Sequence, residues 1–246
     1  EYSCGDMRIH TQIPGRFNVY NSLAAVAVGK KIGLTDEEVE HGIAALTAVE
    51  GRMTRVQVGQ DFEVIVDYAH APDALEKVFE SIGKNANQSA EVADSKKSAK
   101  AKKDAKEKVY RKIPGFAGRI ISVHGGAGRR DPSTREERGE ILGRESDIVI
   151  ITEDDSRDED PAEIAAAFVE GAKKAGKKVD KDLFVELDRR QAIKKALGLA
   201  KKGDLVLILG KGHEKTILRA DGPHDFEDIK VAEELLKELK EVEDAV

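Results

Sequence analysis

The first fifty residues carry hydrophobic positions at helical spacing. Between residues 18 and 32, small and apolar side chains recur every three to four positions, and Gly33 follows as a residue that readily ends a helix. Thr35 and Glu38 then match the capping-box pattern, in which two side chains satisfy free backbone N–H groups at a helix start. The sequence therefore predicts two helices, the second running toward Leu46.

The pattern changes near residue 50, where Gly51 interrupts the helical periodicity. Residues 54–58 and 62–66 are rich in β-branched side chains and flank a short polar turn, so they predict a β-hairpin. We therefore expect a domain boundary here, with a first domain over residues 1–50 and a second over residues 51–246.

Strands and helices are expected to alternate over the second domain. Several strand segments are unbroken runs of Val, Ile and Leu, as in strands buried on both faces of a parallel sheet. The sequence therefore predicts an α/β fold with a Rossmann-like, doubly wound, mainly parallel sheet. The expected strands cover residues 119–123, 147–151, 183–187 and 204–209, and the expected helices begin near Pro72, Ser133, Pro161, Arg189 and Glu227.

Residues 84–112 interrupt this alternation. The segment consists largely of Ala, Lys, Ser and Asp, with ten basic residues against four acidic ones. It offers few apolar side chains to bury, so we expect a solvated, partly helical or disordered insertion. A basic arm for an acidic partner is the alternative, and we assign the segment no chemistry.

Composition narrows the class of protein. Lys and Arg total 41 against 47 acidic residues, a formal charge of -6, which gives no general reason to expect nucleic acid or an anionic membrane as partner. The chain has one cysteine, Cys4, and no apolar run as long as a membrane span. We expect a globular, cytoplasmic, monomeric protein with a small ligand. Because Glu1 stands in place of an initiator Met, we also expect a fragment of a longer protein.

Polar side chains gather directly after each expected strand. Ligands of parallel sheets bind beyond the carboxyl ends of the strands, so these loops are expected to form one crevice. Arginine can grip a carboxylate with two hydrogen bonds and Glu214 can hold an ammonium group, which suits a zwitterionic amino acid. The loops are residues 67–70, 124–131, 152–157, 188–189 and 210–214.

Each cluster also has a simpler interpretation. Arg130 with Asp131, and Arg157 with Asp154, are equally consistent with surface ion pairs. His70 could be only a helix-capping partner. The carboxylates and histidines lack a compact ligand spacing, so we expect no metal site.

The sequence contains no phosphate-binding loop. Residues 171–178 resemble one, but they lack the final Ser or Thr that holds magnesium and they end a helix instead of following a strand. Lys211 does follow a strand, yet Leu205 occupies the place of the required first glycine. We therefore expect no catalytic residue for phosphoryl transfer in this chain.

Six motifs occur in the order found in Mur ligases. The most specific are Asp-Tyr-Ala-His at residues 67–70 and Gly-Lys-Gly-His-Glu at residues 210–214. The chain most resembles the MurE type, the UDP-N-acetylmuramoyl-dipeptide:diamino-acid ligases, over nearly its whole length apart from the lysine-rich insertion. The six motifs cover residues 15–25, 51–53, 67–75, 128–131, 154–161 and 210–214.

The resemblance implies an activity and a set of site residues. In such enzymes ATP phosphorylates the dipeptide carboxylate, and the amino group of the diamino acid then attacks the acyl phosphate. ATP and Mg²⁺ are the implied cofactors, and the protein positions the reactants and stabilises charge. The residues implied near ATP are Asn18, Asn21, Arg52, Asp67 and His70, and those implied for the diamino acid are Arg130, Asp154, Asp155, Ser156, Arg157, Gly210 and Glu214.

Two departures qualify the resemblance. In members that use meso-diaminopimelate the recognition loop reads Asp-Asn-Pro-Arg, whereas residues 154–157 read Asp-Asp-Ser-Arg. The retained Arg157 favours diaminopimelate over lysine, while Asp155 exchanges an amide for a charge. The family's phosphate loop and magnesium ligands belong upstream of the matched region. Residues 1–50 are therefore expected to be the end of the central ATP-binding domain, and the chain alone is expected to be inactive.

Two other functions stay open on the sequence. A related folate or poly-amino-acid ligase shares the ATP chemistry but is expected to lack the 154–157 loop. A stand-alone amino-acid-binding subunit could complete a split ligase whose phosphate loop lies on another chain.

Overall fold

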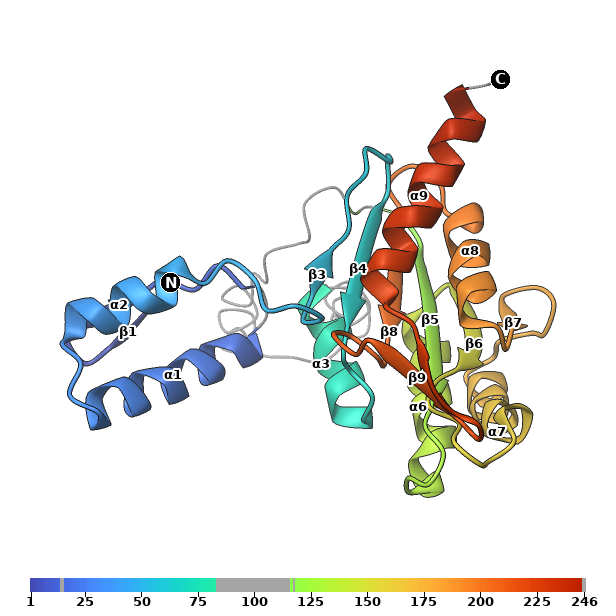
Figure 1. Ribbon diagram of the computed structural model, residues 1–246, viewed down its shortest axis with the longest axis horizontal. Helices are drawn as coiled ribbons and strands as arrows, with labels where there is room; N and C mark the ends of the chain where they lie inside the picture. Colours follow the sequence, from blue (N-terminus) through green and yellow to red (C-terminus); the bar gives the residue numbers. More distant parts are fainter. Residues whose placement is uncertain (14–15, 83–115, 117, 245–246) are drawn as a thin grey trace, which may run out of the picture. The chain divides into compact units, whose positions relative to one another are not determined.

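The computed structural model describes residues 1–13, 16–82, 116 and 118–244 (Figure 1). The insertion expected at residues 84–112 lies outside the described residues, as does Gly15 of the first motif. The chain divides into two compact units, residues 1–49 with 77–112 and residues 50–76 with 113–246.

The two helices expected in the first fifty residues are confirmed. They are α1 (Arg16–Lys31) and α2 (Asp36–Ala45). The capping box is complete, because Thr35 Oγ1 accepts a hydrogen bond from the Glu38 N–H at 3.2 Å and Glu38 Oε2 accepts one from the Thr35 N–H at 2.8 Å. The local sequence therefore sets the start of α2.

A short antiparallel hairpin precedes these helices, and the sequence pattern does not predict it. Strand β1 (Tyr2–Cys4) pairs with β2 (Met7–Ile9) across a turn in which Gly5 has a φ of 60°. Three residues are too few to show a repeating pattern, so only packing identifies these strands. The buried core of this unit consists of Met7, Ile9, Val26 and Val39.

The second unit is built on a six-stranded sheet with the order β3-β4-β8-β5-β6-β7. All neighbours are parallel except β3, which pairs antiparallel with β4. The predicted α/β class and mainly parallel sheet are thus confirmed, and the predicted hairpin is the β3–β4 pair. The strands are β3 (Thr54–Arg55), β4 (Glu63–Asp67), β5 (Ile120–Gly126), β6 (Ile148–Glu153), β7 (Leu183–Val185) and β8 (Leu205–Leu209).

Helices cover both faces of this sheet. The apolar side chains of α8 and α9 form one buried cluster with alternate residues of the strands, such as Val123 and Ile208. On the opposite face, Phe168 of α7 packs edge-on against the His124 ring, with 5.5 Å between ring centroids. The remaining elements are α3 (Pro72–Ile82), a 3₁₀ turn (Pro132–Thr134), α6 (Arg135–Glu145), α7 (Pro161–Lys174), α8 (Arg189–Leu199) and α9 (Asp228–Asp244).

Among the described residues, no helix combines the length and the apolar character that crossing a bilayer requires.

A second hairpin, β9 (Thr216–Arg219) with β10 (Gly222–Asp225), is also absent from the sequence prediction. Its strands have four residues each and are mostly polar, so they give no strand signal. The hairpin is joined to the loop after β6 by a bridge between Arg157 and Arg219.

The strand order determines where a ligand can bind. The chain crosses the sheet from β4 through β5 and β6 to β7 and then reverses, returning to β8 between β4 and β5. Open parallel sheets bind ligands beyond the carboxyl ends of strands at such a reversal. The loops after β4, β5, β6 and β8 lie together at the carboxyl ends of these strands, as the sequence predicts.

Candidate functional site

A cavity of about 370 Å³ lies at the carboxyl ends of these strands. Four of the five predicted loops line it. Its walls carry charges of both signs, which distinguishes it from an apolar pocket. Of the residues predicted for the diamino acid, those lining the cavity are Arg130, Asp154, Asp155, Arg157, Gly210 and Glu214.

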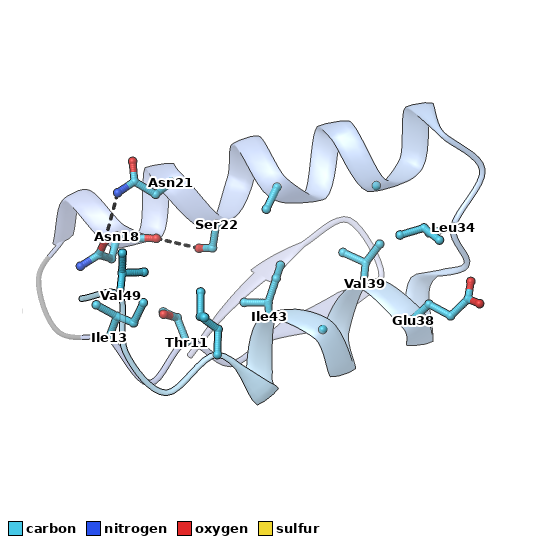
Figure 2. A pocket seen from close by; sticks show the side chains of 14 residues that line it. Thr11, Ile13, Asn18, Asn21, Ser22, Leu34, Glu38, Val39, Ile43 and Val49 are labelled. Carbon is cyan, nitrogen blue, oxygen red and sulfur yellow. Dashed lines mark hydrogen bonds between the residues drawn. The ribbon is translucent and has the colours of Figure 1, made fainter. Parts of the chain in front are cut away.

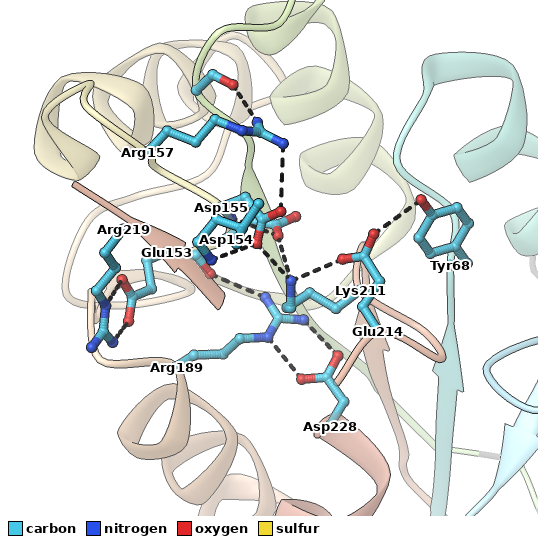
Figure 3. A network of polar contacts seen from close by, with 12 residues as sticks. Tyr68, Glu153, Asp154, Asp155, Arg157, Arg189, Lys211, Glu214, Arg219 and Asp228 are labelled. Atoms are coloured by element: carbon cyan, nitrogen blue, oxygen red, sulfur yellow. Dashed lines mark hydrogen bonds and ion pairs between the residues drawn. The ribbon is translucent and has the colours of Figure 1, made fainter. Parts of the chain in front are cut away.

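The centre of the site is the ammonium group of Lys211, whose side chain is 0% exposed (Figure 3). Lys211 Nζ donates to Asp155 Oδ1 at 2.9 Å, to Glu214 Oε2 at 2.9 Å and to Asp154 Oδ1 at 3.3 Å. The ammonium group therefore ties the loop after β6 to the loop after β8.

Burial and neighbouring charges shift the pKa values of Asp154 and Lys211 in opposite directions. Burial by itself would raise the pKa of Asp154, but the cations Lys211 and Arg189 outweigh it and hold that pKa below its usual value. Burial would likewise lower the pKa of Lys211, and Asp154 with its neighbouring carboxylates outweighs that effect and raises it. Both groups are therefore charged at neutral pH.

The three carboxylates are also the described residues best placed to hold a metal ion. One oxygen each from Asp154, Asp155 and Glu214 lie within 4.8 Å of one another. Sequence spacing does not reveal this cluster, because Glu214 comes from a different loop. The Lys211 ammonium group bonds all three carboxylates, so the cluster as arranged does not fit a magnesium ion.

Arg157 lies on the wall of the cavity and is 25% exposed. Its guanidinium group donates to the Gly128 carbonyl oxygen at 2.6 Å, and its second amino nitrogen lies 3.6 Å from Asp155 Oδ2. The alternative pairing of Arg157 with Asp154 is wrong, because the partner is Asp155. Ser156, predicted beside it, is buried behind the cavity wall.

Two further arginines line the cavity. Arg130 is exposed and makes no hydrogen bond or ion pair with any described residue, so the alternative pairing with Asp131 is not found. Arg138 is buried, with its guanidinium carbon 4.7 Å from the Phe168 ring centre, and it donates to the His70 carbonyl oxygen at 3.0 Å. Sequence reasoning missed Arg138 because it lies within α6 and not in a loop.

Position 210 requires glycine for two reasons, its backbone conformation and the lack of room for a side chain. Its φ of 110° is disfavoured for residues with a side chain. A Cβ atom at this position would lie 3.2 Å from Asp154 Oδ2 and 3.4 Å from His124 Nδ1. The missing side chain therefore leaves room in front of Asp154.

The residues predicted near ATP fall into both units. In the second unit, Arg52 lies over the Tyr68 ring at 4.9 Å, and the rings of His70 and His213 lie 4.7 Å and 5.0 Å from that ring. Tyr68 also donates to Glu214 Oε1 at 3.1 Å, so this aromatic cluster is connected to the charged cavity.

Asp67 is buried, and its carboxylate binds backbone N–H groups. Its two carboxylate oxygens accept hydrogen bonds from the Met53 and Ala69 N–H groups, each at 2.8 Å. Burial raises the pKa of Asp67, while these two N–H groups act in the opposite direction. The contact with Met53, which has a φ of 50°, fixes the turn that presents Arg52.

In the first unit, Asn18 and Asn21 line a separate cavity of about 340 Å³ between α1 and α2 (Figure 2). Asn21 Nδ2 donates to Asn18 Oδ1 at 3.0 Å. The rest of the lining is largely apolar, including Ile13 and Val39.

The expectation that the loop at 188–189 joins the crevice is wrong. Arg189 is fully buried and forms a two-hydrogen-bond ion pair with Asp228, both contacts at 2.8 Å. It also donates to the carbonyl oxygens of Glu153 and Leu209, the last residues of β6 and β8. Asp188 caps α8 instead of facing a ligand. Arg189 therefore holds the ends of β6 and β8 together and does not line the cavity itself.

Comparison with known proteins supports this picture. Residues 97–212 match the family described as Mur ligase, glutamate ligase domain. The chain is 36% identical over 237 residues to a UDP-N-acetylmuramoyl-L-alanyl-D-glutamate–2,6-diaminopimelate ligase of Syntrophomonas wolfei, covering 96% of this chain and 42% of that protein. It is 35% identical to a UDP-N-acetylmuramyl-tripeptide synthetase of a Roseiflexus species, covering 97% of this chain and 40% of that protein.

A solved structure of a UDP-N-acetylmuramoyl-L-alanyl-D-glutamate–2,6-diaminopimelate ligase has the same fold. It superposes with a TM-score of 0.59 and 26% identity, covering 94% of this chain and 40% of that chain. The chain thus spans about two fifths of the length of the relatives it matches.

Proposed function

This chain belongs to the Mur ligase family, and from that premise we propose that it is the part of an ATP-dependent ligase that binds the diamino acid. The complete protein adds this amino acid to UDP-N-acetylmuramoyl-L-Ala-D-Glu in peptidoglycan synthesis, with the cytoplasm as its compartment. We further propose that meso-diaminopimelate is preferred over lysine.

The observation that carries this proposal is the pairing of opposite charges in one cavity. Asp154 and Glu214 provide carboxylates for an ammonium group, and Arg130 and Arg157 provide guanidinium groups for a carboxylate. The far end of diaminopimelate carries both an ammonium and a carboxylate group, whereas that of lysine carries only an ammonium group. A cavity with both kinds of partner therefore suits diaminopimelate.

The residues of this chain fit the nucleoside part of ATP better than its phosphates. Arg52, Tyr68 and His70 form a partly exposed cluster of one guanidinium group and two rings inclined by 67°, and each of these flat groups can stack on a base. We propose that Asn18 and Asn21 also contact ATP and that Asp67 acts by holding Arg52 in place. The 246 residues contain no Gly-Lys-Ser/Thr loop for the phosphates and magnesium.

In the proposed reaction these residues position and do not react. The amino group that attacks the acyl phosphate must be neutral, while the distal ammonium and carboxylate groups remain held in the cavity. Fixing the diamino acid at that distal end orients the attacking amino group and reduces the entropy lost in the reaction.

The test compares Arg157→Ala and Arg157→Lys with the unchanged protein, using calorimetry of meso-diaminopimelate and of lysine binding to the 246-residue chain. Both variants are expected to bind diaminopimelate at least about tenfold more weakly, because an ammonium group cannot reproduce the planar two-donor contact. Lysine, which has no distal carboxylate, is expected to bind with little change.

Arg129→Ala is the matched control. Arg129 has a left-handed φ of 53°, close to the 55° of Arg157, but its partner is the exposed Asp158 and it does not line the cavity. Equal affinity of all variants for diaminopimelate would remove Arg157 from the site. The same comparison in a ligation assay uses the chain joined to the remaining part of one of the ligases it matches.

A further inference from the structure

A fully buried ammonium group at the centre of three carboxylates is an uncommon arrangement. An ammonium group has three N–H donors, and Lys211 uses all three on Asp154, Asp155 and Glu214. It therefore has no donor left for a ligand, although it lies beside the cavity. Lys211 can act on a ligand only through the carboxylates that it holds.

Four of the six carboxylate oxygens around Lys211 accept hydrogen bonds from the described residues. Asp155 Oδ1 also accepts from the Leu218 N–H at 3.0 Å, and Glu214 Oε1 accepts from the Tyr68 hydroxyl. Asp154 Oδ1 also accepts from the Asp155 N–H at 2.8 Å. Two oxygens accept no hydrogen bond from any residue that the structure describes. Asp155 Oδ2 faces an amino nitrogen of Arg157 at 3.6 Å, and Asp154 Oδ2 lies in the space left open by Gly210.

Several cations hold the Asp154 carboxylate in its charged form. Lys211 donates to its Oδ1 atom, and Arg189 and Arg138 act on it as further positive charges. Asp154 Oδ2 is therefore a charged acceptor that takes no hydrogen bond from the described residues, which suits one ammonium group. A divalent ion would need the centre that Lys211 already fills.

We propose that Lys211 is the positioning residue of this cavity: its ammonium group takes the place of a metal ion among the three carboxylates and leaves Asp154 Oδ2 as the acceptor for a substrate ammonium group. The second half of this statement rests on the proposed function. The first half does not, because it concerns only residues of this chain.

Metal binding tests the first half directly. Lys211→Met removes the cation that the three carboxylates share, and carboxylate oxygens are good ligands for Mn²⁺. Lys211→Met is expected to bind Mn²⁺ at least about tenfold more tightly than the unchanged chain, as measured by electron paramagnetic resonance. Adding Asp154→Asn is expected to abolish the gain.

Lys215→Met is the matched control. Lys215 lies in the same loop region and also pairs with carboxylates, Glu50 and Glu227, each at 3.3 Å, but its side chain is 62% exposed. It is expected to gain no Mn²⁺ site. If Lys211→Met also gains none, the carboxylates do not share a centre that Lys211 fills, and the proposal fails.

A measurement on the unchanged chain covers the case in which Lys211→Met does not fold. Nitrogen-15 NMR of lysine ammonium groups is expected to show one slowly exchanging signal from Lys211, because its three protons are hydrogen-bonded and buried. Fast exchange of every lysine ammonium group would contradict the proposal.

Amino-acid binding then tests the second half. If folded Lys211→Met binds diaminopimelate at least about tenfold more weakly than Lys215→Met does, the positioning role is supported. Unchanged affinity would overturn it. If the unchanged chain binds neither diaminopimelate nor lysine, the proposed function fails, whereas the Mn²⁺ and NMR results still decide whether Lys211 replaces a metal ion.

Discussion

His124 is a buried histidine directly beneath the cavity, and its position makes stability depend on pH. The ring is 0% exposed, and neither ring nitrogen has a hydrogen-bond partner among the described residues. Burial, with the positive charge of Arg138 as a second cause, lowers the pKa of His124 from 6.5 to about 3. The folded protein therefore keeps this histidine neutral.

The depressed pKa predicts a loss of stability in mild acid. Between pH 6.5 and about pH 3 the unfolded chain binds a proton at His124 that the folded chain does not, so the free energy of unfolding falls as pH falls. From about pH 7 to about pH 5, the unchanged chain is expected to lose about 2 kcal/mol more than His124→Gln. Urea unfolding of both proteins at the two pH values measures the difference, and equal losses would show that folding does not lower the pKa of His124.

At the scale of elements, the β9–β10 hairpin holds the recognition loop that follows β6. The Arg157 N–H donates to the Leu218 carbonyl oxygen at 2.9 Å, and the Leu218 N–H donates to Asp155 Oδ1. Arg219 adds a two-hydrogen-bond ion pair to Glu153, whose side chain is only 8% exposed. This hairpin therefore sets the left-handed backbone of Arg157 from outside the loop.

Removing the ion pair is expected to loosen the loop without unfolding the sheet. Arg219→Ala leaves the Glu153 carboxylate buried without its partner, which costs about 1 to 3 kcal/mol. Hydrogen exchange of the Arg157 and Leu218 amides is expected to accelerate, and diaminopimelate binding to weaken severalfold.

Arg190→Ala controls for the loss of an arginine ion pair elsewhere. Arg190 pairs with Glu234 and Glu238 on the surface of α8 and α9, and such exposed pairs contribute less than about 1 kcal/mol. It is expected to leave the two amides unchanged. Equal exchange rates in Arg219→Ala and the unchanged chain would show that the hairpin does not hold the loop.

At the scale of the whole molecule, each of the two units has a cavity of its own. Asn18 and Asn21 belong to the first unit, and the charged cavity belongs to the second. The sequence offers no loop that can cradle the β- and γ-phosphates together with magnesium. The proposed function therefore assigns substrate positioning, and not phosphate transfer, to these 246 residues.

This assignment predicts that the 246-residue chain alone does not turn over ATP. Phosphate release by the purified chain is expected to stay at the background rate with or without diaminopimelate, because no residue set holds the transferring phosphoryl group. The chain joined to the remaining part of a matched ligase is the positive control. Phosphate release that copurifies with the isolated chain and is lost in Arg52→Ala would contradict the prediction.

The sequence by itself determined the α/β class, the parallel strands and the loops that carry the site. These features follow from local properties: apolar runs mark buried strands, a capping box starts α2, and parallel strands place their following loops at one edge. The ordered motifs added the family, which the comparisons confirm.

Only the tertiary structure decided which polar residues line the cavity and which are buried and paired within the protein. Arg189 and Lys211 both read as rim residues in the sequence, yet both are buried, one supporting strand ends and the other binding three carboxylates. The two short hairpins likewise have no pattern of their own and exist because they pack. Burial and ion pairing depend on residues far apart in the chain, so no local pattern encodes which charge meets a ligand and which is matched within the protein.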